Sequence, residues 1–306
     1  MLRRLELWAV DKIGKDSRLG KSLGRLHRPV MDVVYRRKIE KTRERAEQLS
    51  RHERESFEDL QSVCMFIGYP RSGHSLVGAL IDAHPNAIIA HELGVLNFVK
   101  RGFTRGQIFS LILANSREYA ERGRAWSGYS YEVPGQWQGR YRKLTVIGDK
   151  KGGVNDDRLQ FLPALNELAG VEVRILHVVR NPFDAISTMS RKTNPYSKEP
   201  EKYINQNIEE FFELAEKNEV VRTNGTNKVL DIWHEDLILD PRGTLRKICE
   251  FYGLEPEESY IEAAAGIVFE KPNKSRERVK WTEEQKAEIL ERMGKFEFLQ
   301  RYSFES

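Results

Sequence analysis

The sequence predicts an α/β fold with three layers, in which a largely parallel central sheet lies between helices. Two observations support this fold class. Five short apolar runs, each long enough for one buried strand, alternate with segments that have helical periodicity. A glycine-containing turn follows the first run directly and leads into a helical segment. Because such folds bind ligands outside the carboxyl ends of their strands, the residues that end each strand are the candidates for function.

Composition predicts one large domain and a smaller accessory segment. The chain has 306 residues, of which 40% are hydrophobic and 31% are charged. Residues 1–54 hold 16 Lys and Arg against 8 Asp and Glu, so their +8 leaves −4 for the rest of a chain with net charge +4. We expect a basic helical N-terminal extension over residues 1–62 and a single domain over residues 63–306.

The basic extension fits either a solvated helical face or a surface for an anionic partner. We expect the solvated face and no nucleic acid, with a homo-oligomer formed through these helices as a further expectation. No apolar run approaches the roughly 18 residues of a membrane span. Cys64 and Cys249 lie in apolar runs and read as reduced core residues, which favours a cytoplasmic protein.

The first strand, residues 63–68, is followed by "GYPRSGHS", which has the glycine spacing of a P-loop. Glycines allow the backbone to wrap around an anion, and free N–H groups at the start of the next helix point into that wrap. We therefore expect the overall fold to be of the P-loop-containing nucleotide hydrolase type. The residue before the serine is His74 instead of the usual lysine, and Arg71 supplies the positive charge of the loop.

The second and third strands, residues 87–90 and 144–149, end in charged residues. His91 and Glu92 follow the second strand, where either side chain is a candidate general base or a structural pair. Lys150 follows the third strand, where a cation either stabilises charge on a transferred group or lies in an ordinary exposed turn.

The fourth strand, residues 173–179, ends at Arg180, and Asn181-Pro182 starts the next helix. Arginine suits bidentate recognition of a phosphate, and the hydroxyl of Ser187 or of Thr188 lies two turns further along the helix. Two anion clamps on neighbouring strands predict a ligand with two separated phosphate-like groups.

The fifth strand, residues 228–233, is followed by an acidic turn and by a helix that starts at Asp240-Pro241 and ends at Gly253. We expect Glu235 and Asp236 to brace loops. A late basic loop holds Lys274, Arg276 and Arg278, which either close over an anionic ligand or are solvated.

Taken in order, these motifs resemble those of the sulfotransferases that use 3′-phosphoadenosine 5′-phosphosulfate (PAPS). In that family a loop of Pro, a basic residue, Ser, Gly, Thr and a hydroxyl residue binds the 5′-phosphosulfate, and "PRSGHS" is similar to it. "RNPFDAIST" is similar to the segment that grips the 3′-phosphate, and "WHEDLILDPRGTLRKICEFYGL" to a segment further along. "GDKK" looks like the strand-end motif of the carbohydrate-directed members. The likeness covers residues 63–295.

The resemblance implies an enzyme that moves a sulfuryl group from PAPS to a hydroxyl or amine of a small-molecule or carbohydrate acceptor, without a metal. It implies catalytic roles for Glu92 as the base, with His91 as the alternative, and for Arg71 and Lys150. The expected donor-binding residues are Pro70, Arg71, Ser72, Gly73, His74, Ser75, Arg180, Thr188 or Ser187, Lys274, Arg276 and Arg278. Thr188 is favoured over Ser187 because it lies eight residues after Arg180.

Two other functions stay open at this point. An ATP-dependent kinase would have the same architecture but would need lysine at position 74. A non-catalytic module would keep the fold and bind a partner. For the acceptor, residues 94–142, which are rich in Tyr and Trp, and residues 193–222 are the expected walls, which suits a sugar or a flat apolar alcohol.

Overall fold

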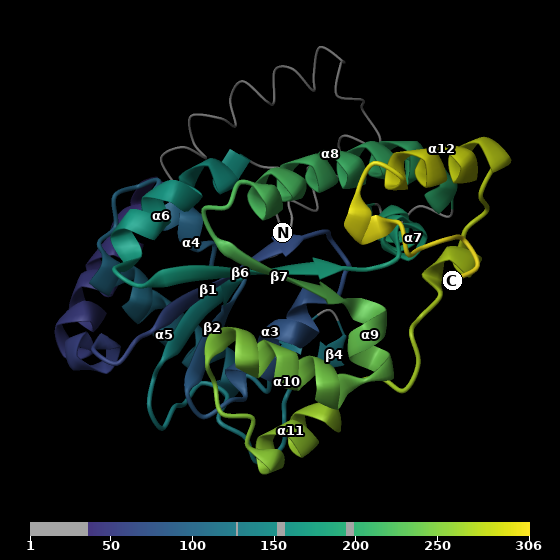
Figure 1. Ribbon diagram of the computed structural model, residues 1–306. Coiled ribbons are helices and arrows are strands. Elements are labelled where there is room, and N and C mark those ends of the chain that lie inside the picture. Colours follow the sequence, from purple (N-terminus) through teal and green to yellow (C-terminus); the bar gives the residue numbers. More distant parts are fainter. Residues whose placement is uncertain (1–35, 127, 152–156, 194–198) are drawn as a thin grey trace. The chain divides into compact units, whose positions relative to one another are not determined.

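The computed structural model describes residues 36–126, 128–151, 157–193 and 199–306 (Figure 1). The chain divides into two compact units, Met1–His52 and Glu53–Ser306. In the first unit residues 36–52 are helical. The rest of the predicted extension, residues 1–35, lies outside the described residues, and the oligomer expected from it stays a prediction.

The second unit starts before its first strand. A 3-10 helix, Arg54–Phe57, comes first, and the side chains of Phe57 and Leu60 are buried. Residues 53–62 therefore pack as part of this unit, although they were predicted to belong to the extension. The predicted boundary between residues 62 and 63 falls instead at the start of strand β1, Ser62–Gly68.

The sheet has five parallel strands in the order β2-β5-β1-β6-β7. The other four strands are β2 (Ala87–His91), β5 (Val146–Lys150), β6 (Glu172–Val179) and β7 (Lys228–Trp233). All five predicted strands are confirmed. Since parallel strands end at the same edge, β1 brings its loop between the ends of β5 and β6.

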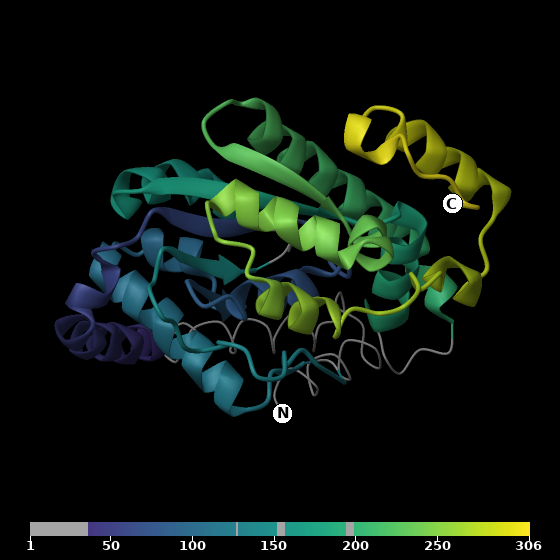
Figure 2. The same cartoon turned by 60° about the horizontal axis from the view of Figure 1, so that its bottom comes forward.

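Helices cover both faces of the sheet, so the predicted three-layer α/β fold is confirmed (Figure 1). Helices α6 (Leu162–Ala169) and α8 (Ile204–Thr223) lie on one face, and α3 (His74–Asp82) and α10 (Pro241–Tyr252) lie on the other. Figure 2 shows α10 and α11 (Glu258–Ala265) along the second face. Apolar clusters fill both interfaces, one around α3 and α10 and one around α8.

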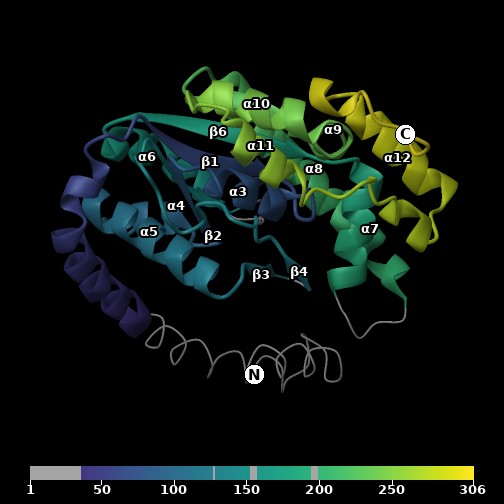
Figure 3. The same ribbon diagram turned by 90° about the horizontal axis from the view of Figure 1, so that it is seen from below.

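The remaining elements lie mainly around the ends of the strands. They are α4 (Val95–Val99), α5 (Arg105–Glu121), α7 (Pro182–Thr193), α9 (His234–Leu239), α12 (Glu283–Met293), the hairpin β3 (Ala125–Trp126) and β4 (Tyr129–Ser130), and the 3-10 helices Asp157–Phe161, Pro200–Tyr203, Ser275–Arg278 and Glu297–Leu299. Figure 3 shows α7 and α12 together at the end of the molecule where α9 also lies. Within the described part of the chain, no helix is long and apolar enough to cross a membrane.

Local sequence signals explain several helix ends. The carboxylate of Asp240 accepts a hydrogen bond from the backbone N–H of Gly243 at 2.9 Å and so caps α10. Gly253 has φ = 68° and ends the same helix in the left-handed conformation. Both ends were predicted from the sequence and are confirmed.

Candidate functional site

The loop after β1 is held close to its surroundings at two glycines. Gly68 has φ = 139°, and a Cβ there would lie 2.4 Å from the carbonyl oxygen of Val178. Gly73 has φ = 99°, and a Cβ there would lie 2.5 Å from Nδ1 of His234. A larger residue would clash at either position and would also be strained. These two glycines allow the loop to turn tightly from β1 into α3.

The start of α3 presents unpaired donors. Gly73 occupies the N-cap position and provides no side-chain cap. None of the described residues accepts a hydrogen bond from the backbone N–H of His74 or Ser75. Free N–H groups and the helix dipole favour an anion at this point. Arg71, with φ = 68°, has an exposed side chain in the same loop.

The side chain of His74 turns into the protein, away from the free N–H groups. Its Nε2 donates to the carbonyl oxygen of Ile67 at 3.2 Å, and its Nδ1 lies 3.0 Å from Oγ of Ser72. Because a carbonyl oxygen only accepts, Nε2 carries the proton of the neutral ring, and Nδ1 competes with the carbonyl oxygen of Tyr69, 2.8 Å from Oγ of Ser72, for the single hydroxyl proton of that serine. Burial, together with the charge of Lys150, lowers the pKa of His74 to about 3. His74 therefore braces the loop as a neutral ring, and Ser72, which is fully buried, does the same.

Lys150 brings the third strand end into contact with this loop. Its aliphatic stem crosses α3 at Gly78, where a Cβ would lie 2.7 Å from Cγ of the lysine. Its ammonium group donates to Oγ of Ser75 at 3.0 Å and to the carboxylate of Glu92 at 2.7 Å. Lys150 is 2% exposed, and burial lowers its pKa. The buried cation Lys150 thus contacts the loop, which has His74 at the position where a P-loop has lysine.

Glu92 is the counter-charge of two lysines. Its second carboxylate oxygen lies 3.1 Å from Nζ of Lys151. Although burial by itself would raise the pKa of Glu92, Lys150 and Lys151 lower it to about 2. The residue also has φ = 56°, an uncommon backbone conformation for a residue other than glycine.

Asp149 fixes the backbone that follows Glu92. Its carboxylate accepts hydrogen bonds from the N–H groups of Leu93, Gly94 and Val95 at 2.7–3.0 Å. Asp149 is fully buried, and burial raises its pKa despite these three bonds. The sequence placed this residue at a strand end, but the structure adds its role as the support of the Glu92 loop.

His91 has a different environment from Glu92. Its ring stacks on Tyr119, with centroids 4.1 Å apart and an angle of 17° between the planes. Burial and the charge of Lys150 lower its pKa to about 3. Of the two candidate bases, the carboxylate of Glu92 is the one that contacts Lys150 beside the loop.

At the fourth strand end, Arg180 connects two loops. It is 7% exposed and donates to the carbonyl oxygen of Arg71 at 3.0 Å, to that of Asn273 at 2.5 Å and to Oγ of Ser275 at 3.2 Å. Burial lowers its pKa. The structure therefore joins Arg180 both to the loop after β1 and to the late basic loop, and its expected role in binding a phosphate stays a prediction.

The two candidate hydroxyls of α7 differ in surroundings. Oγ1 of Thr188 donates to the carbonyl oxygen of Asp184 at 2.8 Å, and this side chain is partly exposed. Ser187 is fully buried, and its Oγ has no hydrogen-bond partner among the described residues.

The late basic loop binds the C-terminal segment. Arg276 is 3% exposed, pairs with Asp184 at 3.3 Å and donates to the carbonyl oxygens of Ser303 and Ser306. Lys274 donates to the carbonyl oxygen of Glu305 at 3.0 Å. The exposed side chain of Arg278 contacts Asn273 within its own loop. None of the contacts described for Lys274, Arg276 and Arg278 is with the loop after β1, although all three residues were predicted to bind the donor.

Several residues of this region were not predicted as part of the site. Asn181 donates to the carbonyl oxygen of Ser303 at 2.9 Å, and its backbone N–H donates to Glu235, which also accepts from the hydroxyl of Tyr302. The bracing role predicted for Glu235 is confirmed. The C-terminal residues carried no recognisable motif, so no signal in the sequence pointed to them.

Fold and site together define a class: a parallel α/β protein with a tight glycine-containing loop after its first strand, free N–H groups at the start of the next helix, and a lysine–carboxylate pair beside that loop. Residues 172–258 match the model of a sulfotransferase family. This segment runs from β6 to the start of α11 and contains Arg180, Ser187 and Thr188. The resemblance predicted from the sequence is thus confirmed, and the match supports sulfotransfer as the general activity. A comparison with curated proteins found no match.

Solved structures similar to this chain include three sulfotransferases. The sulfotransferase domain of the Synechococcus olefin synthase has 20% identity, covers 67% of this chain and 78% of that chain, and has a TM-score of 0.44. Sulfotransferase STF9 from Mycobacterium avium has 12% identity over 82% of this chain and 81% of that chain, with a TM-score of 0.47. Mouse sulfotransferase SULT7A1, complexed with PAP, has 17% identity over 75% and 72%, with a TM-score of 0.41.

Proposed function

We propose that this protein transfers a sulfuryl group from PAPS to a hydroxyl, or an amine, of a small-molecule or carbohydrate acceptor and releases adenosine 3′,5′-bisphosphate. One observation carries the proposal: the ammonium group of Lys150 bonds both Ser75 of the anion-binding loop and Glu92. A cation, a candidate base and free N–H donors therefore converge on one point at the end of the sheet.

The residues present fit the 5′ end of such a donor. The free N–H groups of His74 and Ser75 would bind the 5′-phosphate, and the glycines let the backbone approach it closely. When bound, the donor supplies an activated sulfuryl group on a phosphosulfate. Lys150 and the exposed Arg71 would stabilise the charge that develops on the bridging oxygen and the sulfuryl oxygens, as charge stabilisation does in phosphoryl transfer.

The low pKa of Glu92 suggests when it would act as a base. With both lysines paired to it, the carboxylate is ionised but only weakly basic. A phosphosulfate next to Ser75 would attract the ammonium group of Lys150 and weaken its pairing with Glu92. The pKa of Glu92 would then rise, so that the carboxylate can take the proton of an acceptor hydroxyl. In this proposal the base gains strength only once the donor is bound.

The 3′ end of the donor would be held by Arg180 with Thr188, and by the late basic loop that Arg180 contacts. Arg180 is already oriented by the carbonyl oxygens of Arg71 and Asn273. A phosphate here would take over guanidinium N–H donors that now bond Asn273 and Ser275, from a side chain that is already buried. Metal-independent binding of this donor, and a cytoplasmic location, stay predictions.

Substituting Glu92→Gln tests the proposed base. The amide cannot accept the proton of the acceptor, so we expect kcat to fall by roughly 10²–10⁴-fold. Affinity for adenosine 3′,5′-bisphosphate should remain within a few-fold of the unmodified protein. His91→Gln is the matched control and should lower kcat far less. Full turnover by the Glu92→Gln variant would remove Glu92 from the mechanism.

A thermal-shift comparison tests the donor class against the two alternatives. Adenosine 3′,5′-bisphosphate without metal should raise the unfolding temperature if the proposal is correct. Stabilisation by Mg-ATP alone would instead indicate a kinase. No shift with either ligand would indicate a binding module without this activity.

A further inference from the structure

A row of polar side chains crosses the sheet on the face that α8 covers. The register of the parallel strands places Ile67 of β1, His177 of β6 and Asp231 of β7 side by side. His177 is fully buried, and so is Tyr69, two residues after Ile67. Because residues two apart along a strand face the same side, Tyr69 continues the row at the end of β1. Polar groups are costly in such a core unless hydrogen bonds satisfy them.

The hydrogen bonds of this row have a fixed direction. Nδ1 of His177 lies 2.8 Å from the carboxylate of Asp231, and Nε2 lies 3.3 Å from the hydroxyl of Tyr69. Although burial by itself would raise the pKa of Asp231, the bonds from His177 and Arg222 lower it, so the ionised carboxylate only accepts. Burial lowers the pKa of His177 more than Asp231 raises it, so the ring is neutral. Nδ1 therefore carries the proton, and the hydroxyl of Tyr69 donates to Nε2.

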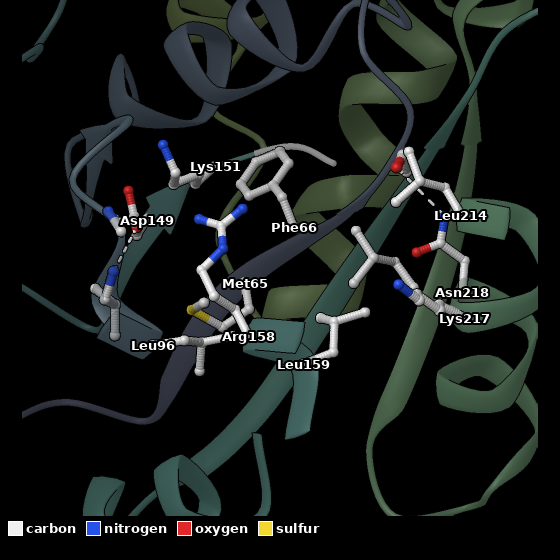
Figure 4. Close-up of a pocket in the computed structure, with 14 residues that line it drawn as sticks. Met65, Phe66, Leu96, Asp149, Lys151, Arg158, Leu159, Leu214, Lys217 and Asn218 are labelled. Carbon is white, nitrogen blue, oxygen red and sulfur yellow. Dashed lines mark hydrogen bonds between the residues drawn. The ribbon is translucent and has the colours of Figure 1, made fainter. Parts of the chain in front are cut away.

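Helix α8 supports the row at both ends. Arg222 donates to the two carboxylate oxygens of Asp231 at 3.0 and 2.7 Å. The ring of Phe211 stacks on Tyr69, with centroids 4.1 Å apart. Asn218, which lines a small pocket between α8 and β1 (Figure 4), donates to the last carbonyl oxygen of β1 at 3.3 Å. One face of α8 thus contacts both β7 and the start of the loop after β1.

Tyr69 is the first residue of the turn in that loop. Its carbonyl oxygen accepts a hydrogen bond from the backbone N–H of Ser72 at 3.3 Å. Arg71, the third residue of the turn, has φ = 68°, and such a strained backbone persists only where the surrounding structure fixes it. The carbonyl oxygen of Arg71 accepts a bond from Arg180. The turn therefore connects the start of α3 with the end of β6.

We propose that His177, with Asp231 behind it, is a positioning residue for the loop after β1. It fixes the hydroxyl of Tyr69 and thereby the turn, so that the free N–H groups at the start of α3 are oriented before a ligand binds. This inference rests on the proposed function, which assigns those N–H groups to the 5′-phosphate of the donor. A loop that is already oriented loses less freedom on binding, so the row increases donor affinity.

The row should leave the chemical step unchanged. Among the residues that the structure describes, no hydrogen bond joins Tyr69, His177 or Asp231 to Lys150 or Glu92. The charges proposed to act on the sulfuryl group therefore keep their places when the row is broken. A loss of affinity with an unchanged kcat is the signature that we expect.

The first arm of the test follows the loop without a ligand. Tyr69→Phe removes the hydroxyl and keeps the ring that stacks on Phe211. Residues 71–75 should become more mobile in this variant, as measured by NMR relaxation of their backbone amides. Tyr252→Phe is the matched control, because its buried hydroxyl donates to the carbonyl oxygen of Arg174 at 3.3 Å, outside the loop.

Both variants lose one buried hydrogen bond, so denaturant unfolding should show similar losses of stability. Greater mobility of residues 71–75 in Tyr69→Phe alone would therefore not be explained by lower stability. Unchanged mobility in Tyr69→Phe, or an equal increase in both variants, would overturn the proposal.

The second arm measures affinity for adenosine 3′,5′-bisphosphate by calorimetry and kcat at saturating PAPS. Tyr69→Phe should weaken bisphosphate binding by roughly fivefold, the size of one hydrogen bond, and Tyr252→Phe by less than about twofold. The kcat should stay the same in both variants. Equal affinity in Tyr69→Phe and the unmodified protein, or equal losses in the two variants, would reject the positioning role.

A double variant links the hydroxyl to His177. His177→Phe keeps a ring but removes both hydrogen bonds, so adding Tyr69→Phe to it should weaken bisphosphate binding by less than about a further twofold. A full additional fivefold loss would mean that His177 does not act through Tyr69. Tyr69→Phe and its control decide the question alone should His177→Phe fail to fold.

The two arms separate this inference from the proposed function. Greater loop mobility in Tyr69→Phe, in a protein that binds no bisphosphate, would leave the positioning row standing and reject the proposed donor. Bisphosphate binding that is the same with and without the hydroxyl of Tyr69 would keep the donor and reject the positioning row.

Discussion

The two ends of the proposed donor site are built differently. At the end of β1, free N–H groups of α3 and the ammonium group of Lys150 face a common point, and Glu92 is the counter-charge of that lysine. At the end of β6, Arg180, Arg276 and Lys274 donate to carbonyl oxygens of the chain itself.

This difference indicates how each end works. The first end has its charges in place before a ligand arrives, so it suits the stabilisation of a transition state. The second end uses its cations to join the phosphate loop, the late loop and the C-terminal segment, so it suits ordering of the donor site. Changes at the first end should lower kcat, and changes at the second end should weaken donor binding.

After Glu92→Gln, the largest effect should come from Lys150→Met. This change keeps the apolar stem against Gly78 but removes the charge that contacts Ser75 and Glu92. Loss of one charged stabilising group costs roughly 10²–10³-fold in rate, so kcat should fall by this factor while bisphosphate affinity changes less. Lys151→Gln is the control. Because Lys151 bonds Glu92 but not Ser75, the fall in kcat should be much smaller in this variant. Equal losses in both variants would mean that contact with the loop is not what matters.

Arg180→Lys tests the second end. A lysine keeps the charge but cannot bond Arg71, Asn273 and Ser275 together with the fork of a guanidinium group. We expect affinity for adenosine 3′,5′-bisphosphate, measured by calorimetry, to fall by roughly a hundredfold. The kcat at saturating donor should change little. A fall in kcat with unchanged affinity for adenosine 3′,5′-bisphosphate would mean that the ends of β1 and β6 do not have the different roles proposed for them.

His74→Thr introduces the residue that the related loops have and tests the inward orientation of the ring. The pKa of His74 is about 3 in the folded protein, below its usual value of 6.5. Between these values the unfolded chain takes up a proton that the folded chain does not. The folded state therefore loses stability as the pH falls below 6.5, by about 2 kcal/mol for this imidazole between pH 7 and pH 5.

Threonine does not titrate, so the variant should lose about 2 kcal/mol less than the unmodified protein over that interval. Denaturant unfolding at both pH values measures this difference. Donor affinity should hardly change, because the N–H of residue 74 remains in place. Equal acid sensitivity of the two proteins would contradict a buried neutral His74.

The sequence predicted the elements that depend on local chemistry. Five apolar runs, the glycines of the first loop and the Asp240 cap were read from the chain and are present in the structure. It did not predict contacts that depend on side-chain direction. The letters "PRSGHS" do not show that the side chain of His74 turns into the protein. Residue spacing likewise does not predict that Arg276 bonds Ser303, which lies 27 residues further along the chain. Such contacts arise from long-range packing, which leaves no period in the sequence.

The smallest effect concerns the two hydroxyls of α7, where register favours Thr188. Thr188 is partly exposed, and its proton can leave the carbonyl oxygen of Asp184 for a phosphate, because that oxygen belongs to the helix backbone. Ser187 is fully buried, so it cannot reach a ligand unless the helix moves. Thr188→Val should therefore weaken bisphosphate binding by about fivefold, the size of one hydrogen bond. Ser187→Ala, measured in the same titration, should have an effect below about twofold, since it removes a hydroxyl that has no partner. The reverse order would assign the 3′-phosphate to Ser187 and would require α7 to shift when the donor binds.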